Sequence, residues 1–314
     1  MSASQTASAV HEVARLGFNA AQGQDLYDRA RPNFPAESMS SILASALAAS
    51  SGRPLRIVEL GAGTGISTRA LLDTIVSLNN TAADTDRIQV SKLFVYEPSP
   101  GMRASFDRAL QAKLPEYTEA QVFTDGSDSV EVSEGTFEDF SLLQDARAQA
   151  SIDVILIAQA WHWAQDHEVA LSNFARVLRP YGCLSLIWNL EDRDAAPWVA
   201  RIRDAYEKHE HGSPQYRLGL WKKMYQTEAL TQYFQALPQE DYTRILPTTH
   251  EAAWNRVLSK SYISLLGQDD LAALRKEYDQ IMEDGDQHGR RWINKDEGVF
   301  EYPYITNLFK FVRK

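Results

Sequence analysis

The sequence predicts an α/β protein built on a doubly wound, mostly parallel seven-stranded sheet. First, short apolar segments alternate along the chain with longer segments of helical character, as strands and crossover helices do in parallel sheets. Second, the run 152–158, Ile-Asp-Val-Ile-Leu-Ile-Ala, has the nearly continuous apolar character of a parallel strand that is covered on both faces. Third, a glycine-rich turn directly follows the first strand-like segment, 56–60.

Up to about residue 190 the predicted elements alternate in the way that such a sheet requires. Parallel neighbours need a crossover connection, so each apolar strand should lead into a segment that returns the chain to the same end of the sheet. Helical character is also expected over 16–49, with a break at Pro32 and Pro35. The expected strands are 56–60, 92–96, 130–133, 152–158 and 184–188, and the expected helices are 67–78, 102–113 and 169–178.

The alternation ends after residue 190. A helical, aromatic-rich stretch follows, and the chain is expected to close with a strand or hairpin that completes the sheet with an antiparallel strand. Two loops interrupt the earlier alternation, a polar one at 79–90 and an irregular, acidic one at 114–129. The expected later elements are the helical stretch 194–237, a strand at 242–246, helices at 251–267 and 269–282, and the strand or hairpin at 299–312.

Composition narrows the class of protein. The 314 residues are 44% hydrophobic and 24% charged, as in ordinary globular proteins, and the net charge of -10 argues against a nucleic acid or an anionic membrane as partner. The single cysteine, Cys183, fits a reducing compartment, and no apolar run approaches the roughly 18 residues of a membrane span. The first ten residues lack the pattern of a signal peptide. We therefore expect a cytoplasmic protein, either a monomer or a dimer.

The segment Glu59-Leu60-Gly61-Ala62-Gly63-Thr64-Gly65 carries the strongest functional signal. A strand, a glycine turn and the start of a helix together form a cradle of the size that a nucleotide needs. A dinucleotide fingerprint would require a third glycine at position 66, which is Ile66. The pattern therefore counts against a nicotinamide dinucleotide as the ligand.

This Glu-x-Gly-x-Gly-x-Gly pattern resembles motif I of the class I S-adenosylmethionine-dependent methyltransferases. The segment Trp161-His162-Trp163, the turn Leu178-Arg179-Pro180-Tyr181-Gly182 and the element 27–35 further resemble the branch of trans-aconitate methyltransferase-like small-molecule enzymes, which carry a type 11 methyltransferase domain. The resemblance covers 24–190 well and 191–314 loosely. It implies a Rossmann-like core that binds S-adenosyl-L-methionine and releases S-adenosyl-L-homocysteine. The implied units are an N-terminal helical lid (1–50), the cofactor-binding core (51–190), a helical substrate cap (191–238) and a C-terminal part that completes the sheet (239–314).

The cofactor residues follow from the strand ends and from the resemblance. Glu97 directly follows the second predicted strand, where a carboxylate can accept from both ribose hydroxyls. The resemblance places Arg31 and Tyr27 over the methionine end of the cofactor, and Thr136 and Phe137 beside its adenine. The full expected set is Tyr27, Arg31, Glu59, Gly61, Ala62, Gly63, Gly65, Glu97, Pro98, Met102, Thr136, Phe137, Gln159 and Ala160.

The acceptor side is less clearly marked. His162 follows the fourth predicted strand, at the edge where ligands bind, and an imidazole there could act as a general base. The alternative, which we slightly favour, is that His162 packs between its two tryptophan neighbours. The neighbouring Asp166, His167 and Glu168 fit a helix N-cap and first turn better than a metal site, so no metal is expected. The expected acceptor-binding residues are Trp161, Trp163, Trp198, Trp221 and Tyr262.

The sequence thus predicts a methyltransferase that uses S-adenosyl-L-methionine and acts on a small organic molecule. The methylated atom stays open between oxygen, nitrogen and carbon, and a carboxylate is one candidate acceptor. Two alternatives also remain open. One is a protein that binds the cofactor without transferring its methyl group, and the other is an NAD-dependent oxidoreductase.

Overall fold

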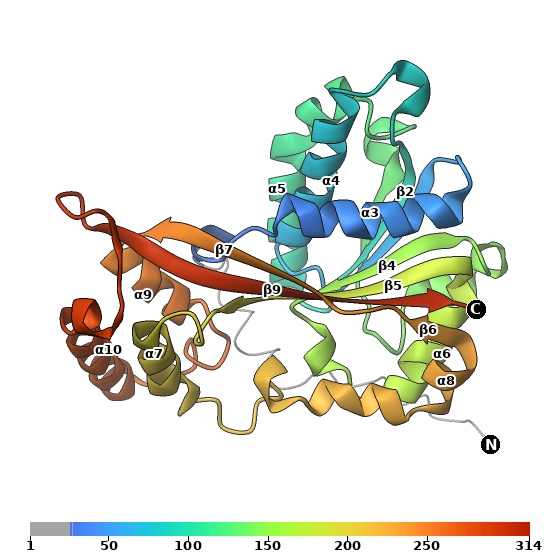
Figure 1. Ribbon diagram of the computed structural model, residues 1–314. Helices are drawn as coiled ribbons and strands as arrows, with labels where there is room; N and C mark the ends of the chain where they lie inside the picture. Colours follow the sequence, from blue (N-terminus) through green and yellow to red (C-terminus); the bar gives the residue numbers. More distant parts are fainter. Residues whose placement is uncertain (1–25, 27) are drawn as a thin grey trace.

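A single nine-stranded sheet organises the computed structural model, which describes residue 26 and residues 28–314 (Figure 1). The neighbouring strands follow the order β3-β2-β1-β4-β5-β9-β6, and β7 and β8 also pair with β9. The strands are β1 (Leu55–Leu60), β2 (Val90–Tyr96), β3 (Val130–Ser133), β4 (Ile152–Ala158), β5 (Leu178–Glu191), β6 (Phe234–Ala236), β7 (Glu240–Thr248), β8 (Trp292–Asn294) and β9 (Val299–Arg313).

The first five strands confirm the predicted doubly wound topology. They are parallel to one another, with β1 between β2 and β4, so the strand order reverses beside β1. In open α/β sheets such a reversal opens a crevice at the carboxyl ends of the strands. The α-helices are α3 (Ala36–Ser50), α4 (Ile66–Asn79), α5 (Pro100–Glu119), α6 (His167–Val177), α7 (Pro197–Glu207), α8 (Glu228–Tyr233), α9 (His250–Leu258) and α10 (Gln268–Glu283).

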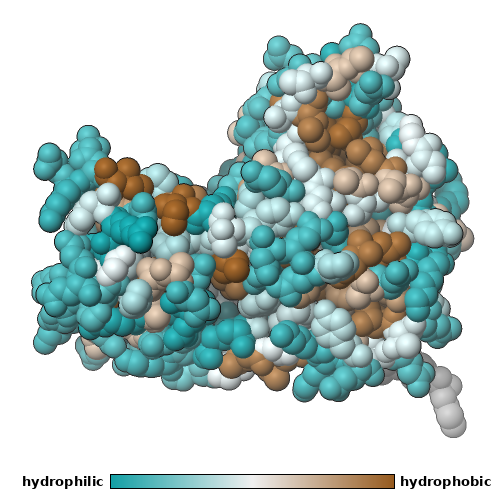
Figure 2. Space-filling model, in the orientation of Figure 1, coloured by the Kyte–Doolittle hydropathy of each residue, from teal (hydrophilic) through white to brown (hydrophobic). Residues whose placement is uncertain are grey.

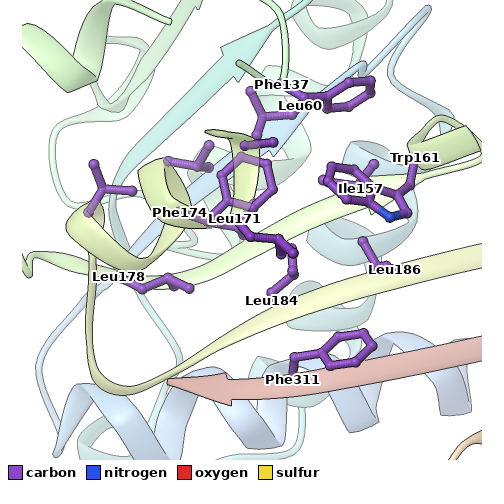
Figure 3. Close-up of a cluster of buried hydrophobic side chains, with 14 of the residues drawn as sticks. Leu60, Phe137, Ile157, Trp161, Leu171, Phe174, Leu178, Leu184, Leu186 and Phe311 are labelled. Atoms are coloured by element: carbon purple, nitrogen blue, oxygen red, sulfur yellow. The ribbon is translucent and has the colours of Figure 1, made fainter. Parts of the chain in front are cut away.

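Two hydrophobic cores cover the two faces of this sheet. All seven residues of β4 are buried, as the apolar run 152–158 predicts. Helices α3, α4 and α5 contribute to the core on one face, and α6 and α8 contribute to the core on the other. Figure 3 shows Trp161, Leu171 and Phe174 within the second of these cores. The carboxyl ends of β1 and β4 are therefore held rigidly from both sides.

The last strand, β9, corrects the predicted count of seven strands. It is antiparallel to β5, as expected, but it also pairs with β6, β7 and β8, which gives nine strands. The sequence marked β9 only as a closing strand or hairpin, because its partners are far away along the chain. Pairing with three further segments satisfies the backbone of a 15-residue strand that would otherwise present a long open edge.

Strands β7 and β9 continue beyond the parallel sheet and carry a third core (Figure 1). Helices α7, α9 and α10 pack there against the start of β9, around Trp198, Tyr278 and Phe300. The predicted helix over 251–267 is shorter than expected, because α9 ends at Leu258 and turns follow it. This break brings residues 259–262 toward the end of β5.

One predicted loop is partly a helix. The segment 114–129 was expected to be irregular, but α5 runs through Pro115 to Glu119. Tyr117 is fully buried there and donates a hydrogen bond to Asp73 on α4, at 3.0 Å. This anchoring explains how the helix tolerates a proline, which removes one backbone hydrogen bond.

The surface carries mostly polar side chains on the face that Figure 2 shows, with smaller hydrophobic areas between them. Its outline is concave between the lobe formed by α7, α9 and α10 and the part formed by α4 and α5. Among the described residues, no helix is long and apolar enough to cross a membrane.

Candidate active site

The glycine turn after β1 forms one side of the site. Gly61, Gly63 and Gly65 have φ angles of 70°, 58° and 83°, a region that side chains with a Cβ rarely adopt. A Cβ at Gly61 would lie 2.8 Å from the Cβ of Ala160, and one at Gly65 would lie 2.6 Å from the ring of Phe106. A Cβ at Gly63 would meet nothing within 4 Å. Packing therefore requires two of the glycines, while the third leaves open space at the turn.

Glu59 holds this turn against α4. Its carboxylate is buried and accepts hydrogen bonds from the hydroxyls of Ser67 and Thr68, which lie in the first turn of that helix. Burial raises the pKa of Glu59 to about 7, although the two hydroxyl groups oppose the shift. The side chain is only 1% exposed. Its geometry fits a positioning role better than a direct contact with a ligand.

Glu97 joins the end of β2 to the glycine turn. Its carboxylate accepts the backbone N–H of Gly63 and the backbone N–H of Ser99, both at 2.9 Å. Burial raises the pKa of this carboxyl group, and the two N–H donors oppose that shift. Each carboxylate oxygen can accept a second hydrogen bond. Pro98 and the buried Met102 continue from this point into α5, so these predicted residues adjoin the turn.

The segment that precedes α3 also meets the turn. Asp28 accepts a hydrogen bond from the hydroxyl of Thr64 at 2.9 Å and pairs with Arg69 of α4 at 2.5 Å. Arg31 donates to the carbonyl oxygen of Ser259 at 3.0 Å, which ties this segment to the end of α9. Tyr27, the other residue predicted here, lies outside the described residues.

The end of β4 forms the opposite side of the turn. Ala160 faces Gly61, and the ring of Phe137 lies 3.5 Å from the position that a Cβ at Gly61 would take. Thr136 is half-buried in the turn beside Phe137. Gln159 has a φ of 56°, and its side-chain amide donates to the carbonyl oxygen of Asn189 at 2.6 Å. Strained backbone of this kind is concentrated at functional sites.

A polar cavity extends from the end of β4 toward the third core. The space around its side chains totals about 650 Å³, the part open to solvent included. The predicted residues Arg31, Gln159, His162, Trp163 and Tyr262 line it. Further residues that line it are Asn189, Leu190, Glu191, Arg203, Tyr206, Glu207, Glu210, Gln215, Tyr216, Arg217, Arg256, Lys260 and Ser261.

Basic side chains outnumber carboxylates around this cavity. In the described part of the chain, five arginine and lysine residues line it against three glutamates, although the whole protein has a net charge of -10. A cluster of opposite charge to the rest of the protein is selective for anionic ligands. The five basic residues are Arg31, Arg203, Arg217, Arg256 and Lys260, and the three carboxylates are Glu191, Glu207 and Glu210.

Glu191 is the centre of the most buried part of this cluster. One of its oxygens, Oε1, lies 3.0 Å from Nε of Arg256 and 3.0 Å from Nζ of Lys260. Arg203 donates to the backbone carbonyl oxygen of Glu191 at 2.9 Å. The surrounding positive charges hold the pKa of Glu191 well below its usual range, although burial alone would raise it. Glu191 is therefore ionised at neutral pH.

His162 is half-buried and lines the same cavity. Its Nδ1 accepts a hydrogen bond from the indole N–H of Trp188 at 3.2 Å. Burial, together with the charge of Arg31, lowers the pKa of His162 to about 3. The ring is thus neutral at pH 7, and because an indole can only donate, the ring proton resides on Nε2. This tautomer presents a donor, not a proton acceptor, at the remaining nitrogen.

Three of the tryptophans predicted to bind the acceptor lie in hydrophobic cores. Trp161 is fully buried and its indole N–H faces the sulfur of Met224. Trp198 packs in the third core against Phe300. Trp221 is 1% exposed and stacks behind Tyr216, which itself lines the cavity. Their large apolar surfaces explain their burial, and none of the three lines the cavity.

Asp166, His167 and Glu168 make contacts with different parts of the structure. Asp166 caps α6 by accepting the backbone N–H of Val169 at 3.0 Å, as the sequence predicts. Glu168 accepts the backbone N–H of Ala229, and the ring of His167 packs on Trp161. These three neighbours in sequence therefore serve three separate contacts.

Sequence reasoning predicted Arg31 but missed the other charged residues of the cavity. Glu191 lies three positions beyond the expected end of the fifth strand, and Lys260 lies two positions before the predicted Tyr262. Arg203 and Arg256 lie on amphipathic helices, where arginines are usually solvated. The available signals were the charge at the end of a predicted strand for Glu191 and the nearby Tyr262 for Lys260, whereas Arg203 and Arg256 had none.

Comparisons with known proteins identify the class that this site belongs to. A family model described as "Methyltransferase domain" matches residues 27–237, which is more than half of the chain. An uncharacterized methyltransferase of Mycobacterium tuberculosis is 33% identical over 187 residues, or 60% of this chain and 57% of that protein. An uncharacterized methyltransferase-like protein of Schizosaccharomyces pombe is 28% identical over 132 residues, or 42% of this chain and 49% of that protein.

The fold comparison agrees. The structure of a proposed type II methyltransferase from Anaeromyxobacter dehalogenans superposes with a TM-score of 0.53 at 16% identity, over 89% of this chain and 97% of the other. The chain belongs to the methyltransferase family. Its curated relatives are matched over little more than half of their length or less. The trans-aconitate-like branch within the family stays a prediction.

Proposed function

We propose that this chain transfers a methyl group from S-adenosyl-L-methionine to a small organic acceptor, and that the acceptor carries a carboxylate. The observation that carries this proposal is the polar cavity that begins at Gln159, next to Ala160, whose Cβ faces Gly61 of the glycine turn. It is lined by five basic side chains in a protein of net charge -10. The division of the chain into lid, core, cap and C-terminal part is retained as part of the same proposal.

The residues at the turn fit a nucleoside cofactor. The open space at Gly63 allows a ligand to approach the backbone, and Glu97 beside it has acceptor capacity for ribose hydroxyls. Gly61, Ala62, Gly63 and Gly65 would form the cradle, with Phe137 and Thr136 toward the base. Arg31 and Gln159 would lie toward the methionine end, because both also line the cavity.

When bound, the cofactor supplies an electrophilic methyl group to a nucleophilic oxygen, nitrogen or carbon. The side chains of the cavity then have to orient the acceptor and exclude water, which are large contributions to such a reaction. A carboxylate acceptor is already nucleophilic and needs no base. The state of His162 agrees with a reaction that needs no base. Its ring is neutral, and its Nε2 can donate a hydrogen bond to an acceptor oxygen.

An excess of positive charge supports an anionic acceptor in particular. With Lys260 protonated, the cavity carries two more positive than negative side chains in the described residues. S-adenosyl-L-methionine does not reduce this excess, because its ammonium and sulfonium charges outnumber its single carboxylate. A carboxylate on the acceptor would reduce it, which favours such an acceptor over a neutral or cationic molecule.

The test is methyl transfer from cofactor labelled in the methyl group. The chain would be incubated with a panel of small carboxylic acids, and each acid would be matched by its neutral amide. We expect label in a product that releases methanol in base, as a methyl ester does, and no label with the amides. The variant Gly63→Val supplies the background.

Two outcomes would favour the alternatives. Calorimetry should show S-adenosylhomocysteine binding at micromolar strength or better, about -8 kcal/mol. Binding of that compound without transfer to any acceptor would indicate a cofactor-binding protein without transferase activity. Binding of NAD in its place would indicate an oxidoreductase.

The stability of the labelled product in base also identifies the methylated atom. Label in a base-stable product would show that the methyl group is on another oxygen, a nitrogen or a carbon, and not on a carboxylate.

A further inference from the structure

Lys260 occupies an unusual position in the cavity. Its side chain is 10% exposed, and its Nζ lies 3.0 Å from Oε1 of Glu191 and 4.2 Å from the centre of the Tyr206 ring. An ammonium group has three N–H donors, and in the described residues Glu191 is the hydrogen-bond acceptor that the structure gives it. The Tyr206 ring covers one further side of this nearly buried cation, and Lys260 also lines the polar cavity.

The neighbouring arginines each have a second acceptor, although Nε of Arg256 makes no hydrogen bond to any described residue. Arg203 donates to Glu207 at 2.8 Å and to the carbonyl oxygen of Glu191 at 2.9 Å. Arg256 pairs with Glu191 and donates to the hydroxyl of Ser259 at 3.1 Å. Glu191 has to balance Arg256 and Lys260 with one negative charge. Lys260 is thus the cation of this cluster to which the structure gives one acceptor, and it shares that acceptor, Oε1 of Glu191, with Arg256.

We propose that Lys260 binds the carboxylate of the methyl acceptor and takes up a proton as that anion binds. The inference rests on the proposed function for the identity of the site and names the residue that makes this site selective. A carboxylate in the cavity near Nζ would accept a hydrogen bond that neither Glu191 nor the Tyr206 ring receives, and would add a negative charge beside Arg256 and Lys260.

The electrostatics of the cluster support this coupling. Burial, together with the charges of Arg256 and Arg31, lowers the pKa of Lys260 to about 7, although Glu191 opposes the shift. The free cavity therefore holds an amine that is about half protonated at pH 7. A bound carboxylate raises this pKa, so the complex takes up a fraction of a proton. The charged and titratable groups that face Lys260 are Glu191 of β5, Arg256 of α9, Tyr206 of α7, Glu210 after α7 and Arg31.

Calorimetry in buffers of different ionisation enthalpy measures this proton uptake directly. The probes are succinate and benzoate, with succinamide and benzamide as neutral controls, each titrated into the protein with and without S-adenosylhomocysteine. We expect the carboxylates to bind with uptake of about half a proton at pH 7. Their affinity should fall about fivefold between pH 7 and pH 8, because the protonated fraction of Lys260 falls by that factor.

Two variants locate the effect. Lys260→Arg keeps its charge at both pH values, so binding should persist without proton uptake and without the fivefold change. Lys260→Met should weaken carboxylate binding by more than tenfold. Both should bind S-adenosylhomocysteine as the wild type does. Lys276→Met, on the exposed surface of α10, is the control for loss of a lysine.

Several results would overturn the inference. The inference is wrong if the carboxylates do not bind at millimolar concentration, or if they bind without proton uptake. It is also wrong if a folded Lys260→Met variant binds carboxylates as tightly as the wild type. If that variant does not fold, the inference is still tested by the number of protons that the wild type takes up and by the pH dependence of binding to Lys260→Arg. A wrong cofactor assignment would give a different result. The protein would then not bind S-adenosylhomocysteine, but it would still bind carboxylates with proton uptake.

Discussion

The glycine turn and the polar cavity differ in how far apart along the chain their contacts lie. The turn combines local contacts of Glu59 with Ser67 and Thr68, 8 and 9 positions away, with contacts to Glu97 and Asp28 across 34 and 36 positions. The cavity joins distant segments: Arg31 contacts the backbone of Ser259 across 228 positions, and Lys260 contacts Glu191 across 69. Steric limits define the first region and charge balance defines the second. Substitutions should therefore fail for different reasons in the two regions.

The largest effect is expected at the turn, from Gly63→Val. A β-branched residue at a φ of 58° is strained by about 1–3 kcal/mol, and its side chain would enter the open space beside Glu97. We expect S-adenosylhomocysteine binding to fall more than 100-fold in calorimetry. Gly52→Val is the matched control, because Gly52 has a φ of 80° and also meets nothing within 4 Å. Equal cofactor binding by the two variants would contradict a cofactor at this turn.

In the cavity, Glu191→Gln should cost stability first. It leaves the charges of Arg256 and Lys260 without their shared, buried counterion, and breaking such a pair usually costs about 3–5 kcal/mol. Since Lys260 can lose its proton, we expect the low end, about 3 kcal/mol, in urea unfolding at pH 7.

The control for this substitution is Glu116→Gln. Glu116 pairs with Lys113 at 2.8 Å, but its side chain is 50% exposed. Such a surface pair contributes about 0–1 kcal/mol. If the two variants lost the same stability, the cluster around Glu191 would be as solvated as an ordinary surface pair.

Glu97→Ala should have an intermediate effect on cofactor affinity. It removes the acceptor for the N–H groups of Gly63 and Ser99 and the expected partner of the ribose. A hydrogen bond to a charged group is worth about 1.5–3 kcal/mol, so affinity for S-adenosylhomocysteine should fall about 10- to 100-fold. Glu134→Ala, whose side chain is 75% exposed, should leave it unchanged. If Glu97→Ala bound S-adenosylhomocysteine with an unaltered dissociation constant, Glu97 would have a structural role and would not bind the ribose.

The smallest effect is expected from His162→Gln. With its proton on Nε2, the ring acts as a donor and a packing group, so turnover at saturation should fall less than about tenfold. The melting temperature should fall by a few degrees, as scanning calorimetry would show. A thousandfold loss of turnover at unchanged stability and cofactor affinity would instead establish His162 as the base.

The pH dependence of stability gives a second readout for His162. Its pKa is lowered from 6.5 to about 3 in the folded protein, so the unfolded chain binds more protons between these values. The folded state therefore loses stability as the pH falls from 6.5 toward 3. His162→Gln should lose less stability over this interval than the wild type.

The sequence predicted those parts of the molecule in which neighbouring residues determine the structure. The strands from β1 to β5, the glycine turn and Glu97 at the end of β2 follow from local patterns of apolar residues and glycines. The extra partners of β9 could not be predicted, because strand register depends on distant segments. Arg256 and Lys260 could not be placed either, because nothing local distinguishes a buried cation from a solvated one.

The pairing of β9 has a consequence for folding. It joins β5 to β6, β7 and β8, and it supports the lobe from which Arg256 and Lys260 reach Glu191. Because β9 follows every other described strand and helix along the chain, the cavity cannot form on the ribosome until β9 has been synthesised. The parallel strands from β1 to β5 are complete more than 100 residues earlier. Under the proposed function, the strands beside the glycine turn are therefore made well before the segments that would select the acceptor.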